Sequence, residues 1–216
     1  MGCEPGSVTG MVVSHEHGDH VGGAGRFSRR FGVPIWATAA TARAARLDPG
    51  SVAGLVTVEA GESFDVADLL VRCFSVPHDS VDNIGMVVEC EETRLGYATD
   101  LGHPSRLVAQ RLSGCDILVT ESNHDREMLM EGPYPWSVKQ RIMGRHGHLS
   151  NTDMESLVTE VATPSVQHLF LAHLSGTNNT PALALQAALR ALRAAGRDTV
   201  PVHVTSQARV SEVVET

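Results

Sequence analysis

The sequence predicts a layered α/β fold, and two observations support this. Short β-branched apolar segments alternate with longer amphipathic segments along the 216 residues, the pattern of strands and helices packed in layers. Polar, chemically reactive side chains recur just past the carboxyl ends of the predicted strands, where α/β proteins place their functional sites. The length fits one domain over residues 1–216, without an internal repeat or a low-complexity linker.

Composition narrows the class of protein. Hydrophobic residues make up 42% and charged residues 19%, which indicates a globular chain rather than a disordered one. Apolar runs are too short to span a bilayer and no signal peptide is visible, so a cytoplasmic protein without a membrane partner is predicted. The four cysteines show no C-x-x-C spacing and are read as reduced thiols.

The first elements lead into and out of a histidine-rich segment. Residues 8–13 are β-branched and apolar and predict a strand. Residues 21–31 predict a helix, which carries Arg26, Arg29 and Arg30 on or near its exposed face. These arginines fit a solvated helix surface and phosphate contact equally well.

The middle of the chain reads as strands with one helix and one hairpin. An Ala-rich helix capped by Thr38 or Thr41 is predicted to run to about Leu47. A turn is expected around residues 60–62 and a hairpin across residues 91–93. The predicted strands cover residues 34–37, 56–58, 69–76, 84–90 and 94–98.

The last part alternates helices and strands. His124 and Asp125 fit either a supporting role at the site or, more readily, the start of a helix. Ser150 or Asn151 is expected to cap another helix that has Glu155 in its first turns. The predicted helices cover residues 104–112, 126–130, 137–145 and 181–195, and the predicted strands cover residues 116–120, 167–172 and 200–205.

A metal-binding motif follows the first predicted strand. His15, His17, Asp19 and His20 alternate in the spacing H-x-H-x-D-H, which suits an extended segment or its terminal loop rather than one helical face. Imidazole and carboxylate are the ligands that catalytic Zn²⁺ and similar divalent ions take. One H-x-H pair arises by chance, whereas three histidines and an aspartate at this spacing are much rarer.

Further candidate ligands follow later strands. His78, Asp100 and His173 each lie just past an apolar run, as does Glu121. If these strand ends converge, seven ligands are available for two divalent ions, Zn²⁺ or Mn²⁺. Two ions sharing a carboxylate and an activated hydroxide predict hydrolysis, which needs no redox or nucleotide cofactor. Their charge would also offset the net charge of −8, which by itself argues against broad attraction to nucleic acid.

The ordered motifs resemble those of the metallo-β-lactamase-fold hydrolases. The resemblance implies an α/β four-layer αββα sandwich, here lacking its first N-terminal strands, because this chain begins about a dozen residues before the motif. It implies that His15, His17 and His78 hold one ion. It assigns Asp19, His20 and His173 to the other ion, with Asp100 bridging, and an aspartate there is similar to the phosphodiesterase and glyoxalase branches.

Longer segments narrow the resemblance to one family. Residues 121–125, 132–136, 147–151 and 172–175, with Asn178 and Asn179, are similar to the YycJ/WalJ bacterial exonucleases. That family implies 5′→3′ degradation of DNA. By analogy with the tRNA 3′-processing branch, His148 is a general acid oriented by Glu121, and Asp19 belongs to the catalytic group. The alternative for Glu121 and His148 is a supporting or helix-capping role.

A predicted substrate-binding segment lies beside these motifs. Tyr134 and Trp136 could stack on bases or pack on the body of the protein, and the adjacent helix carries Lys139, Arg141 and Arg145 as a phosphate-binding face. These residues favour a nuclease acting on DNA by metal-bridging hydroxide attack. Two alternatives remain open, a two-metal hydrolase of a small ester or cyclic phosphodiester and a non-catalytic metal-stabilised module.

Overall fold

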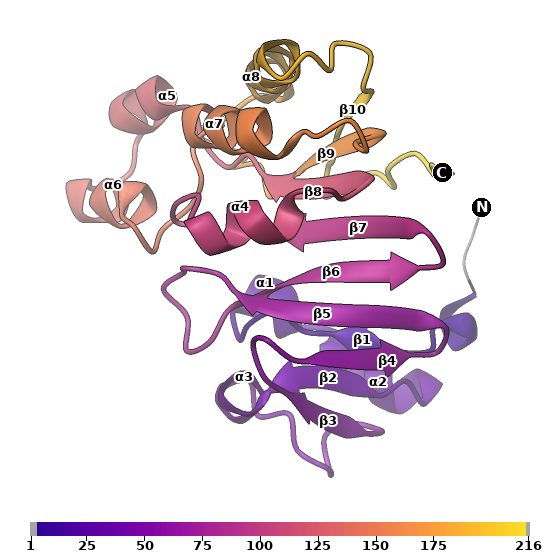
Figure 1. The fold of residues 1–216 in the computed structure, drawn as a ribbon. Coiled ribbons are helices and arrows are strands. Elements are labelled where there is room, and N and C mark those ends of the chain that lie inside the picture. The colour runs from indigo at the N-terminus through magenta and orange to yellow at the C-terminus, as the bar shows by residue number, and fades with distance from the viewer. Residues whose placement is uncertain (1–3, 215–216) are drawn as a thin grey trace. The chain divides into compact units, whose positions relative to one another are not determined.

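The computed structural model describes residues 4–214, which form two compact units. The N-terminal unit runs to Ser75 and includes Ser80–Ile84, and the C-terminal unit comprises Val76–Asp79 and the chain from Gly85 onward. Both units combine helices with β-sheet (Figure 1). The mixed α/β architecture is therefore confirmed, whereas the single domain over residues 1–216 stays a prediction. No helix within residues 4–214 is long and apolar enough to cross a membrane.

The N-terminal unit contains five strands and the helices between them. Its elements are the 3-10 helix η1 (Pro5–Ser7), β1 (Met11–Val12), α1 (Gly18–Val21), α2 (Ala24–Phe31), β2 (Ile35–Thr38), α3 (Ala39–Ala44), β3 (Leu55–Val58), β4 (Ser63–Val66) and β5 (Leu69–Ser75).

Strands β1, β2 and β3 form a parallel sheet with β2 in the centre. Ile35 and Ala37 point to one face of β2 and pack with Ala24 of α2 and Ala42 of α3 in a single apolar cluster. Because side chains two residues apart in a strand share a face, α2 and α3 cover the same face of this sheet.

The opposite face of β2 packs against the antiparallel hairpin β4–β5. Trp36 stacks on Phe64 with ring centroids 6.3 Å apart. Gly10 lies beneath this indole, where a Cβ would approach Trp36 to 2.5 Å and Val66 to 2.7 Å. Residues on both faces of β2 thus contribute to the apolar packing of the unit.

The C-terminal unit carries the remaining strands and the longest helices. Its elements are β6 (Ile84–Cys90), β7 (Thr93–Ala98), α4 (Arg106–Leu112), β8 (Ile117–Glu121), α5 (Arg126–Glu131), α6 (Trp136–Met143), α7 (Asn151–Val161), β9 (His168–Ala172), α8 (Pro181–Ala194) and β10 (Val202–Val204).

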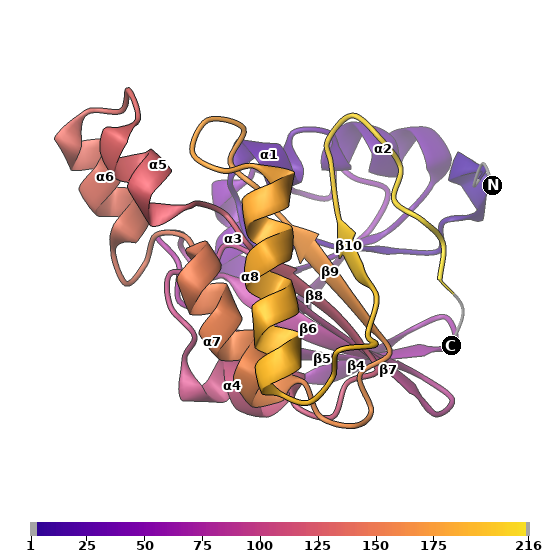
Figure 2. The same cartoon turned by 90° about the horizontal axis from the view of Figure 1, so that it is seen from above.

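The strands of this unit follow the order β10-β9-β8-β7-β6. β6 and β7 form the predicted antiparallel hairpin, and β7, β8, β9 and β10 are parallel. Helices α7 and α8 lie side by side along the sheet, with α4 beside α7 (Figure 2). Helices α5 and α6 project beyond the edge at which β7 and β8 end (Figures 1 and 2). Parallel strands bring their carboxyl ends to one edge, where the polar residues of the candidate site follow.

Several predicted boundaries were wrong for local reasons. The strand predicted over residues 8–13 is reduced to β1, and the helix predicted over residues 21–31 is divided into α1 and α2 at Gly22 and Gly23, which interrupt helices at low cost. Strand β4 was not predicted. Of the two proposed caps for α3, Thr38 accepts the hydrogen bond from the Thr41 amide.

Candidate metal centre and adjoining cavity

The N-terminal unit gathers three imidazoles in the loop after β1. The ring centroid of His15 lies 4.6 Å from that of His17 and 4.1 Å from that of His20. The hydroxyl oxygen of buried Ser14 lies 3.1 Å from Nδ1 of His15 and 3.3 Å from Nδ1 of His20. Ser14 therefore orients two rings through their Nδ1 atoms and directs their Nε2 atoms elsewhere.

Asp19 lies in the first turn of the short helix α1 and is exposed. Its Oδ2 is 3.6 Å from Nε2 of His20. His17 is the N-cap residue of this helix, so the H-x-H-x-D-H segment starts as an extended loop and ends as a helical turn. The predicted loop geometry holds for His15 and His17, while Asp19 and His20 are helical.

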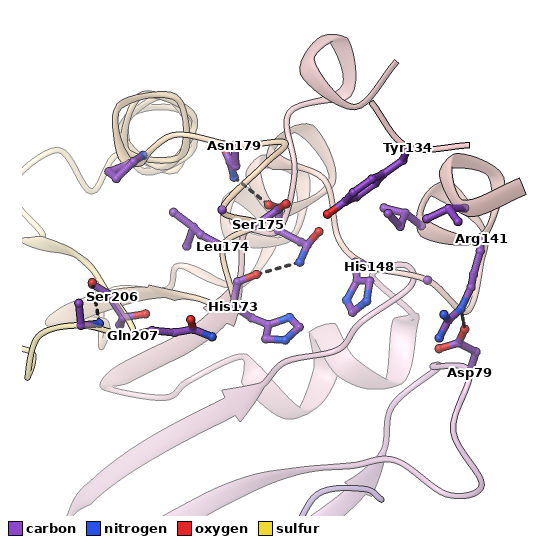
Figure 3. A pocket seen from close by; sticks show the side chains of 18 residues that line it. Asp79, Tyr134, Arg141, His148, His173, Leu174, Ser175, Asn179, Ser206 and Gln207 are labelled. Atoms are coloured by element: carbon purple, nitrogen blue, oxygen red, sulfur yellow. Dashed lines mark hydrogen bonds and ion pairs between the residues drawn. The ribbon is translucent and has the colours of Figure 1, made fainter. Parts of the chain in front are cut away.

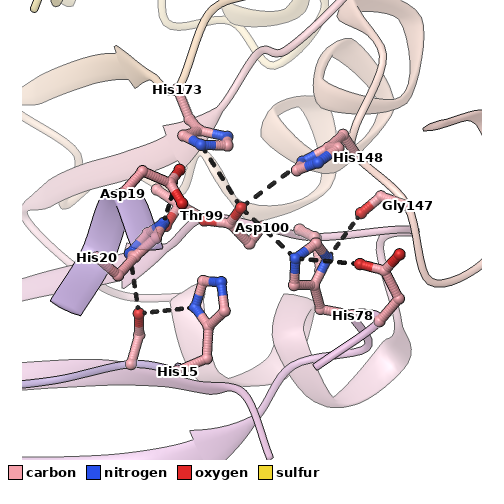
Figure 4. A network of polar contacts seen from close by, with 12 residues as sticks. His15, Asp19, His20, His78, Thr99, Asp100, Gly147, His148 and His173 are labelled. Atoms are coloured by element: carbon pink, nitrogen blue, oxygen red, sulfur yellow. Dashed lines mark hydrogen bonds and ion pairs between the residues drawn. The ribbon is translucent and has the colours of Figure 1, made fainter. Parts of the chain in front are cut away.

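The C-terminal unit places Asp100, Glu121 and His173 just past β7, at the end of β8 and just past β9. Asp100 Oδ1 lies 3.7 Å from Nε2 of His78, 3.5 Å from Nε2 of His173 and 3.7 Å from Nδ1 of His148 (Figure 4). The predicted convergence of these strand ends is thus present within this unit. It joins His78, Asp100 and His173 with His148.

Glu121 orients the histidines of this cluster through hydrogen bonds. Its side chain is fully buried, and Oε1 accepts hydrogen bonds from Nδ1 of His148 and Nδ1 of His173, both at 2.8 Å. Oε2 accepts the backbone amides of Leu101 at 2.7 Å and Leu149 at 3.0 Å. Burial raises the pKa of this carboxyl, but the hydrogen bonds from the two histidines outweigh burial and leave the pKa below its usual value.

His148 follows α6 in a loop that Gly147 allows to pass close to the helix end. A Cβ on Gly147 would meet the carbonyl oxygens of Ile142 and Arg141 at 2.1 and 2.2 Å. Burial lowers the pKa of the His148 imidazole, while its hydrogen bond to Glu121 and the nearby Asp100 charge raise the pKa more strongly. The net upward shift favours a protonated His148.

His78 is held by the same loop. Its Nδ1 lies 3.0 Å from the Gly147 carbonyl oxygen, so this nitrogen carries the proton and Nε2 faces Asp100. The ring is buried, and this burial lowers its pKa against the attraction of Asp100. A neutral imidazole with its Nδ1 proton engaged by a carbonyl is the form that binds a metal ion through Nε2.

Backbone conformation marks the same residues. Asp100 and His173 both adopt left-handed φ values, 55° and 57°. This region is unfavourable for residues other than glycine, although aspartate and histidine enter it more readily than most. Asn123 supports the turn at His173, because its side-chain amide donates to the His173 carbonyl oxygen at 2.9 Å.

The donor set fits a divalent metal ion. Asp100, Glu121, His148 and His173 each offer one ligand atom within 4.8 Å of the others. Glu121 uses Oε1 to bind the Nδ1 atoms of His148 and His173, so it orients imidazoles and is poorly placed as a ligand itself. Ligand atoms around a tetrahedral Zn²⁺ are about 3.3–3.4 Å apart, close to the 3.5–3.7 Å between Asp100 Oδ1 and the Nε2 atoms of His78 and His173.

Two asparagines of the segments that resemble the family have structural roles that the sequence did not predict. Asn179 donates through Nδ2 to the backbone oxygens of Ser122 and Asn123, which ties the loop after β9 to the end of β8. Asn123 holds His173 as described above. The signal was the run of polar residues directly after a buried strand, Ser122 and Asn123, which only a hydrogen-bonding role explains.

A cavity of about 880 Å³ opens beside His148 and His173 within the C-terminal unit (Figure 3). Tyr134 and Arg141 line one side, and residues 205–208, after β10, line another. Ser175 and Asn179 add polar groups, whereas Leu174 and Pro181 are apolar. The volume lies within the range of small-molecule and cofactor sites and greatly exceeds that of a phosphate group.

The five predicted substrate-binding residues differ in position. Tyr134 lines the cavity, as does Arg141, which pairs with Asp79. Trp136 is 56% exposed at the start of α6, and Arg145 is exposed next to His103; neither is among the cavity-lining residues.

Lys139 differs from the other basic residues of this set. Its side chain is buried and its ammonium group donates to the Met130 carbonyl oxygen at 2.6 Å. This contact holds the ammonium group against the last turn of α5. Phosphate binding by Lys139 stays a prediction, which the buried position does not favour.

Comparison with known proteins places the chain in a family. The profile of the beta-lactamase superfamily domain matches residues 3–174. The exodeoxyribonuclease YycJ of Bacillus anthracis is 34% identical over 191 residues, which are 88% of this chain and 72% of the relative. The chain belongs to the YycJ/WalJ family of the beta-lactamase superfamily.

Other relatives agree with this assignment. The exodeoxyribonuclease WalJ of Streptococcus pneumoniae is 30% identical over 187 residues, covering 84% of this chain and 69% of WalJ. The metallo-beta-lactamase fold protein YhfI of Bacillus subtilis has the same fold, with a TM-score of 0.70 at 13% identity over 93% of this chain and 76% of YhfI. The predicted fold class and family are therefore confirmed, and this YycJ/WalJ-family member is a metal-dependent hydrolase.

Proposed function

We propose that the protein is a nuclease that cleaves phosphodiester bonds in DNA from a 5′ end. The observation that carries the proposal is the Glu121 carboxylate, which orients His148 and His173 beside Asp100 at the mouth of a cavity large enough for a nucleotide. The YycJ and WalJ relatives are named exodeoxyribonucleases, which supports DNA as the substrate. The direction follows from the resemblance of the sequence motifs to that family.

The proposed metal ligands are the seven residues of the sequence motifs. His15, His17 and His78 are assigned to one ion, Asp19, His20 and His173 to a second, and Asp100 to both. Ser14 and Glu121 support this assignment, because they bind the Nδ1 atoms of His15, His20 and His173. When bound, divalent ions such as Zn²⁺ or Mn²⁺ supply Lewis acidity toward phosphoryl oxygens and make water nucleophilic near neutral pH.

The chain's own residues perform the remaining steps. Tyr134 offers an aromatic face for a base, and Arg141 offers a guanidinium for a phosphate, both on the cavity wall. His148, protonated through its bond to Glu121, donates a proton to the leaving oxygen of the cleaved strand. A general acid is most effective with a pKa near the working pH, and the upward shift of the His148 pKa by Glu121 and Asp100 is in that direction.

The experiment compares labelled DNA with a small phosphodiester. Protein loaded with Mn²⁺ or Zn²⁺ is given linear duplex and single-stranded DNA labelled at the 5′ or the 3′ end, circular DNA, and bis(p-nitrophenyl) phosphate. Early release of labelled mononucleotide from the 5′ end of linear DNA, with circular DNA intact, is expected. Rapid hydrolysis of the small ester with all DNA intact would instead identify a small-ester hydrolase.

Three variants assign the roles. His17→Ala and Asp100→Ala are expected to lose bound metal, measured by elemental analysis, together with DNA cleavage. His148→Ala is expected to keep the metal and to lose about 10²–10⁴-fold in rate, the usual contribution of a general acid. Full turnover on DNA by His148→Ala would show that His148 has another role.

A further inference from the structure

A cluster of arginines in the N-terminal unit is not explained by the chemistry of the site. From His20 to Leu47 the sequence contains five arginines and no aspartate or glutamate. All five are exposed, three on α2 and two at the end of α3 or just past it. We call them the arginine surface: Arg26, Arg29, Arg30, Arg43 and Arg46.

The two helices present these residues from one layer. Ala24 of α2 and Ala42 of α3 pack into the same apolar cluster, so both helices lie on one face of the β1-β2-β3 sheet. Arg29 joins them, because its guanidinium donates to the carbonyl oxygen of Ser51 in the segment after α3. The arginine surface therefore belongs to one helical layer of the unit.

These arginines lack carboxylate partners, whereas five arginines of the C-terminal unit have them. Within residues 4–214, no residue of the arginine surface forms an ion pair with an aspartate or glutamate, and Arg30 instead lies over the Phe31 ring at 5.3 Å. By contrast, Arg190 pairs with Glu155 at 2.7 Å and Arg193 with Asp198 at 3.5 Å. In a chain of net charge −8, an uncompensated positive patch is a local feature that attracts polyanions.

Arg46 allows the charge to be tested apart from stability. It follows α3 in the left-handed region with φ 55°, where helices usually place glycine. Helix α2 of the same unit follows this rule with Gly32 at φ 71°. Glycine would therefore fit position 46 at a lower conformational cost than arginine does.

We propose that the arginine surface binds the phosphate backbone of DNA, outside the cavity and without reading sequence. Arginine suits this role because its planar fork binds phosphate oxygens in a bidentate manner. Such contacts neutralise phosphates and release counterions, so affinity falls steeply with salt. This surface rests on the proposed nuclease function and adds to it a second contact that retains the substrate.

The test measures binding of the metal-loaded protein to a phosphorothioate-linked duplex, which resists cleavage, by fluorescence anisotropy between 50 and 300 mM salt. Arg26→Gln/Arg43→Gln removes one charge from each helix, and Arg190→Gln/Arg193→Gln removes two paired charges from α8 as a matched control. The first variant is expected to weaken binding about 10-fold and to lower the salt slope by about 2. The control is expected to bind as the wild type does.

Arg46→Gly separates binding from stability. Glycine relieves the left-handed backbone, so the melting temperature is expected to be unchanged or higher while DNA affinity falls. Equal affinity and salt slope in the arginine variants and the control would overturn the proposal. So would an arginine-dependent binding to phosphatidylglycerol vesicles with unchanged DNA binding, which would identify a membrane surface.

The same assay distinguishes the two proposals. Arginine-dependent DNA binding without cleavage of ordinary DNA would support the arginine surface and overturn the nuclease function. Cleavage of DNA with binding that is insensitive to the arginines would do the reverse. Absence of DNA binding by the wild type would overturn both.

Discussion

Asp100 and His173 hold Oδ1 and Nε2 3.5 Å apart while both residues adopt the left-handed backbone, with φ 55° and 57°. They follow two parallel strands, β7 and β9, that flank β8. The left-handed conformation costs each of these two residues about 1–2 kcal/mol of conformational free energy. A metal ion bound by these two side chains would offset this cost.

The first prediction concerns Asp100. Asp100→Gly removes the carboxylate and the backbone cost together, so the metal-free variant is expected to melt at or above the temperature of the metal-free wild type. Added Zn²⁺ or Mn²⁺ is expected to raise the melting temperature of the wild type only. Asp100→Val removes the carboxylate but keeps a side chain that disfavours the left-handed conformation. It is expected to have a lower melting temperature than Asp100→Gly. A glycine variant that melts lower than the valine variant would contradict this explanation.

The second prediction concerns Glu121. Glu121→Gln replaces an acceptor of four hydrogen bonds by an amide that cannot accept from both histidines and both backbone amides. Metal affinity, measured by calorimetric titration, is expected to fall about 10–100-fold because His173 is no longer oriented. Glu155→Gln, which alters a half-buried carboxylate on α7 paired with Arg190, serves as the control and is expected to keep wild-type affinity.

The third prediction separates two basic residues of α6. Lys139→Met leaves the Met130 carbonyl without its donor and is expected to lower the free energy of unfolding by about 1–3 kcal/mol. Arg141→Gln alters an exposed pair with Asp79 and is expected to change stability by less than about 1 kcal/mol while raising KM for DNA. Urea unfolding and DNA cleavage kinetics on both variants check this contrast. An unchanged KM in Arg141→Gln would remove Arg141 from the substrate site.

The fourth prediction is a pH dependence of stability from His124. Burial lowers the pKa of this imidazole to about 4, below its ordinary value of 6.5. Between pH 6.5 and about 4, His124 is therefore protonated in the unfolded chain but neutral in the folded chain. Stability is complete above pH 6.5 and falls as pH decreases toward 4, by about 2 kcal/mol between pH 7 and pH 5.

Urea unfolding at pH 7, 6 and 5 measures this loss. His124→Gln removes the titrating group, so its free energy of unfolding is expected to decline less steeply as the pH falls. Some decline is expected to remain, because burial also lowers the pKa of His78. Parallel curves for the two proteins would show that His124 is not the source. His20→Gln is the control, because it makes the same substitution and leaves the buried ring of His124 in place.

Much of the site was predictable because its residues stand where apolar runs end. Asp100, Glu121 and His173 each follow a strand whose buried pattern is legible, and the parallel order of β7, β8 and β9 brings them together. Thr38 and Ser150 were each one of two caps proposed for their helices, and Asp125 was proposed as part of a helix start. All three are the N-cap residues, because a short polar side chain before an amphipathic segment has one efficient local use.

The errors arose where local pattern and tertiary packing disagree. Strand β4 reads Ser63-Phe64-Asp65-Val66, and its alternating polar residues resemble a turn until the hairpin with β5 is known. Lys139 looks like a surface charge because α6 is basic, yet packing against α5 buries it. The hydrogen bonds of Asn123 and Asn179 join segments about 50 residues apart, which spacing along the chain does not reveal.

Residues 205–208, which complete one wall of the cavity, come after nearly every other element of the fold. These residues are distant in sequence from Asp100, Glu121 and His173, which form the polar cluster. The shape of the cavity can therefore vary through residues 205–208 without any change in that cluster.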